Sequence, residues 1–580
     1  MNKRSFYLAM RDRTRIAVDV FLPKEAGMGT RVPAILSQTR YFRAYQFRWP
    51  FRLFLPDSLY TRIRKRFLRN GYAWVSVDVR GTGASFGQVK IAFSREQVED
   101  AGEIVDWIVN QPWSDGQVGG YGASYDGICA ELLLYLKHPA VRAVMPAYAP
   151  FDLYEDISFP GGLFLSWFYQ SWGEANRIMD RNAVQEEKGL AWRLLLKGVA
   201  PVDADRDRSL LHQAVAEHHD NWDPYETLQG RTFRDEKVEV GGGYSIDDLS
   251  PHTRVDRAVR SRVPVFSCSG WFDAGYARAA VKRFLSSGDS LNWLTLGPWD
   301  HGGFHNDSPT VQRRSRFDHA GEALQFFDRS MKGKGTATKG EKRVRYYTMI
   351  EDRWKQSEVW PPAGTRMRPF YLAASRRLSL KRPGDSEEHD TYPADLSAGT
   401  GTRSRWRTLT LSVRGAGLYP DRKERDVKLF TYTSDPLEHD LEVSGHPLVH
   451  LYISADADDA ALYVYLEDVY EKGRVTMVTE GQFRALHRKL SAEQVYGNLI
   501  PHRSYYKKDA LPLIHGEVTE LVFDIIPTSY VFRQGHAIRL ALAGADQDHF
   551  GPLPGDPPEI HIHRNAAYPS RVELPVLQLK

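Results

Sequence analysis

The chain has little of several things that would point to particular classes of protein. It contains only two cysteines, Cys129 and Cys268, in 580 residues, so no disulfide framework can be expected to hold the fold together. Both lie in apolar stretches, and we expect them to be small buried hydrophobic side chains. The 77 basic and 73 acidic residues leave a net charge of only +4, which argues against a nucleic-acid partner.

Long apolar runs of the kind that target or anchor a chain are also missing. The first seven residues contain no extended hydrophobic segment, and the charged residues Arg11, Asp12 and Arg13 follow soon after. We therefore expect no signal peptide, no membrane span and a cytoplasmic location.

No zinc-type cluster is apparent, and the glycine pair at 81–83 lacks the lysine and the spacing of a phosphate-binding loop. We predict neither a metal nor an organic cofactor.

A chain of 580 residues is too long for one hydrophobic core, so two or three domains are expected. In residues 1–150 short apolar strands alternate with amphipathic helices, which is typical of a mostly parallel sheet covered on both faces. One such helix, at 94–109, starts with the capping pair Ser94 and Gln97 and stops before Pro112. The expected strands are 16–22, 32–36, 74–79, 118–121 and 141–145.

The alternation of strands and helices stops at residue 151 and resumes near residue 261. Residues 151–260 contain long amphipathic stretches and predict a helical cap inserted into the α/β domain, whose second part then covers 261–344. Beyond that point helical periodicity disappears, and strands rich in β-branched and aromatic residues recur between turns. We predict an all-β sandwich over 345–580.

The most informative segment is the run GYGASYDG at 120–127. Apolar stretches lead into it and out of it, as expected where a strand turns sharply into a helix with Ser124 at the apex. A serine hydroxyl is a poor nucleophile unless it is exposed, held and relieved of its proton, and small neighbours allow the turn that projects it. Taken alone, the run could equally be an ordinary glycine-rich turn.

A serine nucleophile needs a histidine base, and the base needs an acid that fixes its tautomer. In α/β hydrolases these residues follow in the order serine, acid, histidine. Asp273 and His301 each follow a late expected strand, and their order matches. Helix N-capping is the alternative role for Asp273, and an ordinary loop position is the alternative for His301. His305 is a second candidate base, whereas Asp300 suits a helix N-cap or the surface better.

Acyl transfer also requires two donors for the oxyanion of the tetrahedral intermediate. The backbone N–H of Tyr125, directly after the serine, is one candidate. The second donor commonly comes from the loop after an earlier strand, here residues 36–43, which has no glycine-rich run. The Tyr41 hydroxyl is therefore the candidate for the second donor, although a packing role is the more ordinary one for a tyrosine.

With these residues in place, the chain resembles the family of cocaine-esterase-like hydrolases and X-prolyl dipeptidyl-peptidases. Its serine run is similar to the GxSYxG elbow of that family, and further matching motifs occur in order along the chain. They are MRD at 10–12, DVRGTGAS at 78–85, QPWSDG at 111–116, GWFD at 270–273, GPWDH at 297–301 and YPSRVELP at 568–575.

The resemblance implies an α/β-hydrolase domain, a helical cap inserted into it and a C-terminal jelly-roll domain. It also implies that Ser124, Asp273 and His301 form a catalytic triad. The Tyr41 hydroxyl and the Tyr125 N–H are the oxyanion donors that it implies.

This chain departs from the family pattern at two positions. Arg13 occupies a hairpin turn where the family often has glycine, and Asp126 stands where many members carry an apolar residue. Asp126 could meet a cationic amino group of a substrate, and a favourable place beside the helix dipole is the competing explanation. The candidate pocket walls are Trp167, Phe168, Trp172, Phe272 and Asp126, each of which core packing could also explain.

We predict a serine hydrolase that cleaves carboxylic esters, or amides, through a covalent acyl-enzyme. The expected partner is a small-molecule ester or acyl substrate, with no nucleic acid and no membrane, and homo-oligomerisation stays open. The family also contains X-Pro dipeptidyl-peptidases, α-amino-acid ester hydrolases and β-lactam acylases, which remain alternatives because the fold does not choose among them. A non-catalytic glycan-binding protein is the alternative from another class.

Overall fold

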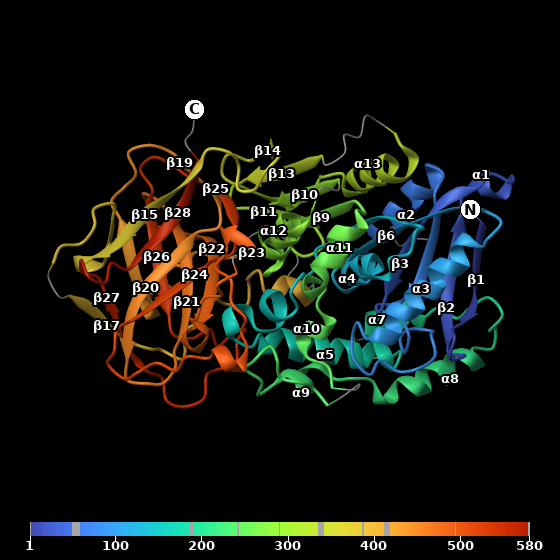
Figure 1. The fold of residues 1–580 in the computed structure, drawn as a ribbon, viewed down its shortest axis with the longest axis horizontal. Coiled ribbons are helices and arrows are strands. Elements are labelled where there is room, and N and C mark those ends of the chain that lie inside the picture. Colours follow the sequence, from blue (N-terminus) through green and yellow to red (C-terminus); the bar gives the residue numbers. More distant parts are fainter. Residues whose placement is uncertain are drawn as a thin grey trace.

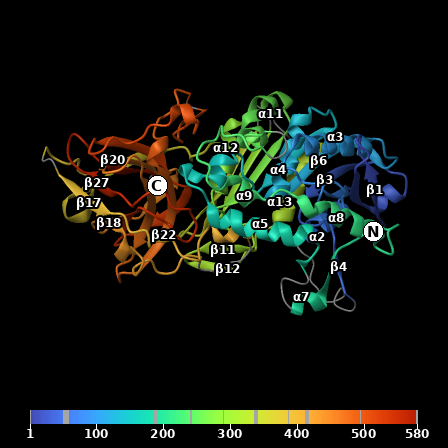
Figure 2. The same ribbon diagram turned by 90° about the horizontal axis from the view of Figure 1, so that it is seen from below.

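The structure is a computed structural model that describes nine stretches of the chain, residues 2–48, 59–184, 190–239, 243–288, 291–334, 341–385, 388–410, 418–493 and 495–577. An α/β domain, in blue and green, occupies one end of the molecule, and an all-β domain, in orange and red, occupies the other (Figure 1). Helices of the inserted cap run along one side of the α/β domain, and the view from below shows them in front of it (Figure 2).

The α/β domain is built on a sheet of ten strands in the order β1-β2-β5-β3-β6-β7-β9-β10-β13-β14. Six of the nine pairings are parallel, and three at the edges are antiparallel. The mostly parallel sheet expected from the sequence is therefore confirmed. The strands are β1 (Asn2–Ala9), β2 (Arg15–Leu22), β3 (Val32–Thr39), β5 (Ala73–Asp78), β6 (Ser114–Ala123), β7 (Val141–Ala147), β9 (Val265–Gly270), β10 (Asn292–Gly297), β13 (Lys342–Thr348) and β14 (Arg353–Ser357).

Helices cover both faces of this sheet, because its strands are apolar on both sides. α3 and α4 pack on one face, and α2 and α13 pack on the other. The helices of the domain are α1 (Lys24–Gly27), α2 (Leu59–Arg69), α3 (Arg95–Val109), α4 (Tyr125–Leu132), α12 (Tyr276–Ser286) and α13 (His319–Lys332). Among the described residues, no helix has both the length and the apolar character needed to cross a membrane.

Two local signals read from the sequence appear in the structure. Arg13 lies in the β1–β2 turn with a φ of 69°, a conformation that glycine adopts without strain. Ser94 caps α3 by accepting the N–H of Gln97 at 3.3 Å. The reciprocal bond differs from the expected capping box, since the Gln97 side chain accepts from the N–H of Phe93 and from the Tyr125 hydroxyl, each at 3.0 Å.

The cap lies between β7 and β9 in sequence and is mostly helical. Its helices are α5 (Ser166–Asp180), α7 (Leu190–Leu195), α8 (Ser209–Glu217), α9 (Pro224–Leu228), α10 (Ile246–Leu249) and α11 (Val255–Ser261). One short strand of the cap, β8 (Leu196–Val199), pairs with β4 (Tyr45–Phe47), which follows β3. A second short hairpin, β11 (His305–Ser308) with β12 (Val311–Arg314), extends the loop after β10.

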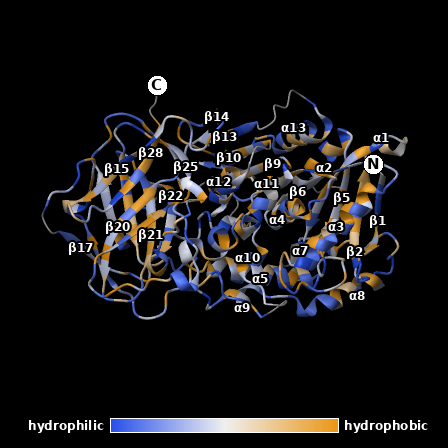
Figure 3. Ribbon diagram, in the orientation of Figure 1, coloured by the Kyte–Doolittle hydropathy of each residue, from blue (hydrophilic) through white to orange (hydrophobic). Residues whose placement is uncertain are grey.

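The all-β character predicted for the C-terminal part is confirmed, with thirteen of its described strands in one sheet, and hydrophobic colours concentrate in strands such as β20 and β21 (Figure 3). Its strands are β15 (Thr365–Ala373), β16 (Arg377–Ser379), β17 (His389–Pro393), β18 (Phe430–Ser434), β19 (Leu441–Gly445), β20 (Leu448–Ala455), β21 (Ala461–Val469), β22 (Val475–Arg484), β23 (Val495–Asn498), β24 (Thr519–Asp524), β25 (Thr528–Phe532), β26 (Ala537–Ala543), β27 (Glu559–His563) and β28 (Arg571–Leu577).

The expected start of this domain at residue 345 differs from the structure. β13 pairs in parallel with β10, and β14 pairs with β13, so both strands extend the α/β sheet. Residues 343–346 of β13 alternate polar and apolar side chains as a sandwich strand does, and such a pattern does not say which sheet a strand joins. The β domain therefore begins after Ser357, with β15.

Candidate active site

Ser124 stands at the turn between β6 and α4. Its backbone angles are φ 61° and ψ −128°, a combination that non-glycine residues rarely adopt. Gly122 and Gly127 permit the turn: a β-carbon on Gly122 would lie 2.0 Å from the Asp126 carbonyl oxygen, and one on Gly127 would lie 2.8 Å from the Ala149 side chain. The serine run thus forms the strained turn expected of it, and Ser124 lines a cavity beneath the cap.

Asp273 and His301 lie in contact on the loops that follow β9 and β10. The imidazole Nδ1 is 2.6 Å from the Asp273 Oδ1, and the Ser269 hydroxyl donates to the other carboxylate oxygen at 2.8 Å. Asp273 is fully buried and His301 is 7% exposed. A carboxylate at Nδ1 places the ring proton on that nitrogen, so Nε2 is left as the basic atom.

The sheet brings all three candidate residues to the same edge. They follow β6, β9 and β10, which lie in the neighbouring run β6-β7-β9-β10 of parallel strands. The carboxyl ends of such strands are where α/β folds place their chemistry. Tyr276 connects the two groups, because it lines the cavity of Ser124 and its ring centre is 5.6 Å from that of His301.

The alternative assignments have other partners. Asp300 is buried and pairs with His305 at 2.5 Å, so it is neither a helix cap nor a surface residue, and the predicted roles for it were wrong. Asp273 does not cap the next helix, since α12 starts at Tyr276 with Gly275 at its N-cap.

Within the described part of the chain, no group of three or more acidic, histidine or cysteine side chains is arranged to hold a metal ion.

The two candidate oxyanion donors also border the cavity. The Tyr41 hydroxyl accepts the indole N–H of Trp172 at 3.0 Å, which leaves its own hydrogen free to donate. Burial is the largest influence on this phenol and raises the pKa of Tyr41 above its usual value, so the hydroxyl stays protonated. Tyr125 is the first residue of α4, where a backbone N–H has no acceptor inside the helix.

The cavity that contains Ser124 is narrow, about 80 Å³ in volume. The described residues that line it carry no charged side chain. Phe168 and Trp172, two of the predicted pocket walls, belong to this lining, and Trp222 of the cap adds a third ring. The other lining residues are Tyr41, Ile91, Ala92, Phe93, Tyr125, Ile128, Pro150, Leu153, Ile157, Ser158, Tyr169, Thr227, Leu228, Val238, Ser245, Ile246, Leu249 and Tyr276.

Three other predicted pocket residues do not line this cavity. Trp167 packs against the β domain, with its ring 6.1 Å from that of His549. Phe272 is buried and its ring centre is 6.3 Å from that of Tyr419. Sequence spacing gave the elements on which these residues lie, but not the direction in which each ring points.

Asp126, the third of them, is buried beneath the serine turn rather than in the cavity. It accepts a hydrogen bond from the Tyr60 hydroxyl at 3.0 Å, and the same hydroxyl accepts the N–H of Ala123 at 3.0 Å. Burial raises the pKa of Asp126 to about 7. Tyr60 was missed by sequence reasoning, because it lies on α2 and no local pattern links it to the turn.

The β domain reaches the loop that carries Asp273. The Arg405 guanidinium donates to the carbonyl oxygen of Trp271 at 2.9 Å, and the Thr408 hydroxyl donates to that of Phe272 at 3.2 Å. Arg405 is buried and lies 3.2 Å from a Glu480 carboxylate oxygen. The C-terminal domain therefore holds two consecutive carbonyl groups directly before the candidate acid.

Comparison with known families decides the relationship of the chain. Residues 12–303 match the family described as X-Pro dipeptidyl-peptidase (S15 family), and residues 336–573 match the X-Pro dipeptidyl-peptidase C-terminal non-catalytic domain. The chain belongs to the S15 family. The family resemblance inferred from the serine run and its companion motifs is thereby confirmed.

The curated relatives of this S15-family chain include proteins named as esterases and one from Streptomyces avermitilis named as an Xaa-Pro dipeptidyl-peptidase, which is 22% identical, covering 94% of this chain and 78% of its own length. A Mycobacterium bovis protein named as a serine esterase is 45% identical, covering 100% of this chain and 96% of its own length. The cocaine esterase of a Rhodococcus species is 25% identical, covering 98% of this chain and 97% of its own length. The S15-family chain is therefore an enzyme, a serine hydrolase.

Solved structures support the fold. A CocE/NonD family hydrolase from Staphylococcus aureus superposes with a TM-score of 0.72 at 18% identity, over 99% of this chain and 93% of its own. An α-amino acid ester hydrolase superposes with a TM-score of 0.71 at 21% identity, over 99% of this chain and 96% of its own. The α/β-hydrolase fold with a C-terminal all-β domain is confirmed.

Proposed function

We propose that this S15-family enzyme hydrolyses carboxylic esters by two-step acyl transfer. In the first step Ser124 Oγ attacks the ester carbonyl carbon while His301 Nε2 takes the hydroxyl proton, and the alcohol leaves with that proton. In the second step the same imidazole deprotonates a water molecule, which attacks the acyl-serine and releases the acid. Asp273 holds the imidazole in the required tautomer and stabilises the imidazolium through the 2.6 Å contact.

The oxyanion of each tetrahedral intermediate is assigned to the Tyr41 hydroxyl and the Tyr125 N–H. The bond from the Trp172 indole to the Tyr41 oxygen supports this role, because it directs the phenol hydrogen away from the indole. Pre-arranged donors of this kind contribute about 3 kcal/mol each to lowering the barrier. Both residues line the cavity of Ser124.

The observation that carries the choice of an ester is the uncharged lining of this cavity among the described residues. A dipeptidyl-peptidase or an α-amino-acid ester hydrolase acts on a substrate with a free cationic amino group, which needs a carboxylate partner when it is taken out of water. Asp126 does not supply that partner, since its side chain is bonded to Tyr60 beneath the turn. An apolar acyl or alcohol group suits the aromatic walls.

Because the cavity is small, about 80 Å³ in volume, we expect the cap to move when a substrate enters. Drug-sized ligands occupy pockets of roughly 300–1,000 Å³, and lids that open and close over active sites are common in hydrolytic enzymes. Phe168 and Trp172 belong to α5 of the cap, so a shift of this helix would widen the cavity beside Ser124.

Two measurements test the proposal. A fluorophosphonate probe should label the wild-type enzyme and not the Ser124→Ala variant. Labelling of that variant, or no labelling of either protein, would contradict the assignment of the nucleophile. A serine outside the cavity, such as the exposed Ser209 of α8, provides the matched control, and Ser209→Ala should be labelled like the wild type.

Substrate class is tested by comparing p-nitrophenyl butyrate with Gly-Pro-p-nitroanilide and phenylglycine methyl ester. We expect the first to be turned over with the highest kcat/KM. Turnover of Gly-Pro-p-nitroanilide alone would replace the ester proposal with the X-Pro dipeptidyl-peptidase alternative. Preference for the amino-acid ester would favour the α-amino-acid ester hydrolase or β-lactam acylase alternative instead.

A further inference from the structure

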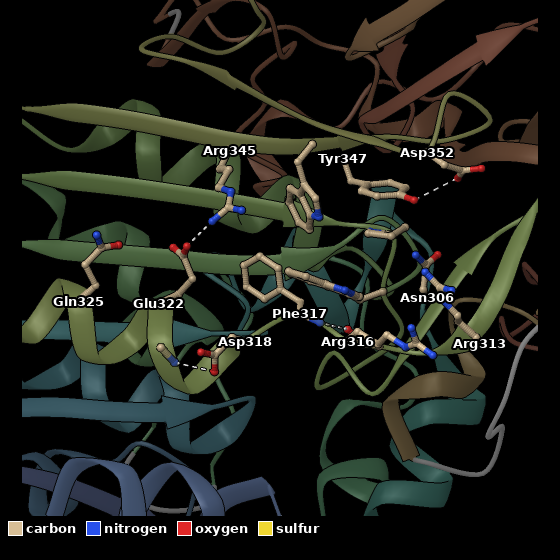
Figure 4. A pocket seen from close by; sticks show the side chains of 15 residues that line it. Asn306, Arg313, Arg316, Phe317, Asp318, Glu322, Gln325, Arg345, Tyr347 and Asp352 are labelled. Atoms are coloured by element: carbon tan, nitrogen blue, oxygen red, sulfur yellow. Dashed lines mark hydrogen bonds and ion pairs between the residues drawn. The ribbon is translucent and has the colours of Figure 1, made fainter. Parts of the chain in front are cut away.

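A second and larger cavity, of about 650 Å³, opens on the α/β domain away from Ser124. It lies between the β11–β12 hairpin, the start of α13 and strands β13 and β14, and Figure 4 shows its side chains. Its lining shares no residue with the lining of the Ser124 cavity. We refer to it below as the hairpin cleft.

One wall of the hairpin cleft carries two half-buried aromatic rings, Phe317 and Trp354, which are backed by two buried ones. The Phe317 ring lies 4.9 Å from that of Trp354, with an angle of 35° between the two planes. Trp299 lies 4.8 Å from Phe317, and Tyr347 lies 5.3 Å from Trp354. Trp299 and Tyr347 are buried, whereas Phe317 and Trp354 are half-buried and present ring surface to the cleft. Flat apolar groups stack on surfaces of this kind.

The acidic side chains of the hairpin cleft already have partners. Glu322 is in contact with Arg345 and with a second arginine, and Asp318 is paired with Arg66 at 2.9 Å. The Asp352 carboxylate accepts from three hydroxyl groups. Two of the three acids are thus paired with arginines, and the Asp352 carboxylate is occupied by hydroxyl donors. The Arg345 guanidinium lies 5.2 Å from both the Phe317 and Trp354 rings.

Two basic side chains of the hairpin cleft, in contrast, have no ion-pair partner among the described residues. Arg313, on β12, and Arg316, three residues later, both line the cleft and are exposed. Within the described part of the chain, no carboxylate lies within ion-pair distance of either guanidinium. Guanidinium groups bind carboxylates through paired N–H donors and also stack on flat rings. The cleft thus joins two half-buried rings to two guanidinium groups that have no ion-pair partner among the described residues.

We propose that the hairpin cleft binds an aryl carboxylate. The ring lies against Phe317 and Trp354, and the carboxylate is held by Arg313 and Arg316. Its volume of about 650 Å³ is within the range of small-molecule sites, which are typically apolar cavities with a few polar groups that fix orientation. This binding does not depend on the hydrolytic reaction, because the two cavities are separate.

Isothermal titration calorimetry of the full chain with 2-naphthoate tests the proposal. We expect saturable binding, and weaker binding of both 2-naphthol, which lacks the charge, and acetate, which lacks the ring. Binding should weaken as salt is added, since the arginines are exposed. Equal affinity for 2-naphthol and 2-naphthoate, or no binding of 2-naphthoate, would overturn the proposal.

Variants locate the site. The double variant Arg313→Ala/Arg316→Ala should bind 2-naphthoate about tenfold or more weakly, as expected when charge-assisted hydrogen bonds are removed. The control Arg366→Ala, which removes an exposed arginine on β15, should bind like the wild type. Arg313 and Arg316 are both exposed, so the double variant should lose binding of 2-naphthoate while its melting temperature and its rate of ester hydrolysis stay unchanged. Unchanged binding by the double variant would place the ligand elsewhere, including the Ser124 cavity, and would refute the proposal.

Discussion

The Tyr60 hydroxyl joins Asp126 to the backbone on the other side of Ser124. It donates to the Asp126 carboxylate at 3.0 Å and accepts the Ala123 N–H at 3.0 Å, so one phenol contacts the residue before the candidate nucleophile and the residue two positions after it. The turn has a positive φ at Ser124, and external bonds are needed to hold a conformation that the local sequence does not favour.

Replacing Tyr60 by phenylalanine should disturb this turn. The Tyr60→Phe variant takes one hydrogen bond from the buried Asp126 carboxyl, which keeps its interaction with Thr39, and leaves the Ala123 N–H without its partner; loss of such a partner typically costs about 1–3 kcal/mol. We expect a lower kcat with a KM close to that of the wild type, because the phenol does not line the cavity. Steady-state kinetics with p-nitrophenyl butyrate measures both. Tyr72→Phe, which removes a phenol that bonds Asp328 on the outer helix α13, is the control and should leave kcat unchanged. A raised KM with unchanged kcat would contradict the positioning role.

Asp126 should make the stability of the protein depend on pH. Burial raises its pKa to about 7 in the folded chain, from near 4 in the unfolded chain. The folded state then binds more protons than the unfolded state between these values, so this contribution to stability is complete below about pH 4 and is lost as the pH rises through 7. The difference of about three units between the two pKa values corresponds to roughly 4 kcal/mol of unfolding free energy.

The Asp126→Asn variant tests this dependence, because asparagine resembles the protonated acid at every pH. Relative to the wild type it should gain stability as the pH is raised from 4 to 8. Urea denaturation at a series of pH values measures the gain. Asp12→Asn, at an exposed carboxyl whose pKa is lowered by Arg80, is the control and should show no gain in this range. A constant difference between Asp126→Asn and the wild type would show that Asp126 is ionised throughout.

The Tyr41 hydroxyl should be required for catalysis but not for folding. The Tyr41→Phe variant loses one oxyanion donor, and loss of such a donor typically lowers kcat about 10²–10³-fold. Trp172→Phe removes the indole N–H that donates to the Tyr41 oxygen together with part of a ring that lines the cavity, so its kcat should fall less than that of Tyr41→Phe and its KM should change as well. An unchanged kcat for Tyr41→Phe in ester hydrolysis would remove Tyr41 from the mechanism.

The acid of the proposed triad can be tested through the tautomer that it imposes. Asp273→Asn keeps the shape of the side chain but no longer favours a proton on His301 Nδ1, and kcat should fall by about 10³–10⁴-fold. Ser269→Ala removes only the hydroxyl that donates to the second carboxylate oxygen at 2.8 Å, and should cost much less. Asp300→Asn, in the neighbouring pair with His305, serves as the matched control. If it lowered kcat as much as Asp273→Asn does, the assignment of the acid would be wrong.

Much of the fold followed from the sequence, because strand and helix periodicities are local. The alternation before residue 150, the serine turn and the order Ser124, Asp273, His301 could all be read in this way. The start of the β domain could not, since β13 joins the α/β sheet through its long-range pairing with β10, and β14 follows it by pairing with β13.

The same limit applies to the surroundings of the site. Phe168 and Trp172 point into the cavity, while Trp167 on the same helix points to the β domain, as expected from the rotation of about 100° between neighbours on a helix. No pattern in the sequence indicates which of these rings faces inward. Tyr60 and Arg405 are separated from the residues they support by 63 and 134 positions, so no spacing rule could have found them.

The hydrogen bonds from Arg405 and Thr408 to the Trp271 and Phe272 carbonyl groups imply that the α/β domain needs the β domain for its full structure. A fragment ending at Ser357 would contain every side chain assigned to the reaction, yet it would expose the buried Trp271 and leave both carbonyls without donors. A protein truncated after Ser357 should therefore have a disordered loop after β9, the loop that carries Asp273. The β domain therefore contributes to the reaction indirectly, because it keeps the segment that ends in Asp273 in its folded conformation.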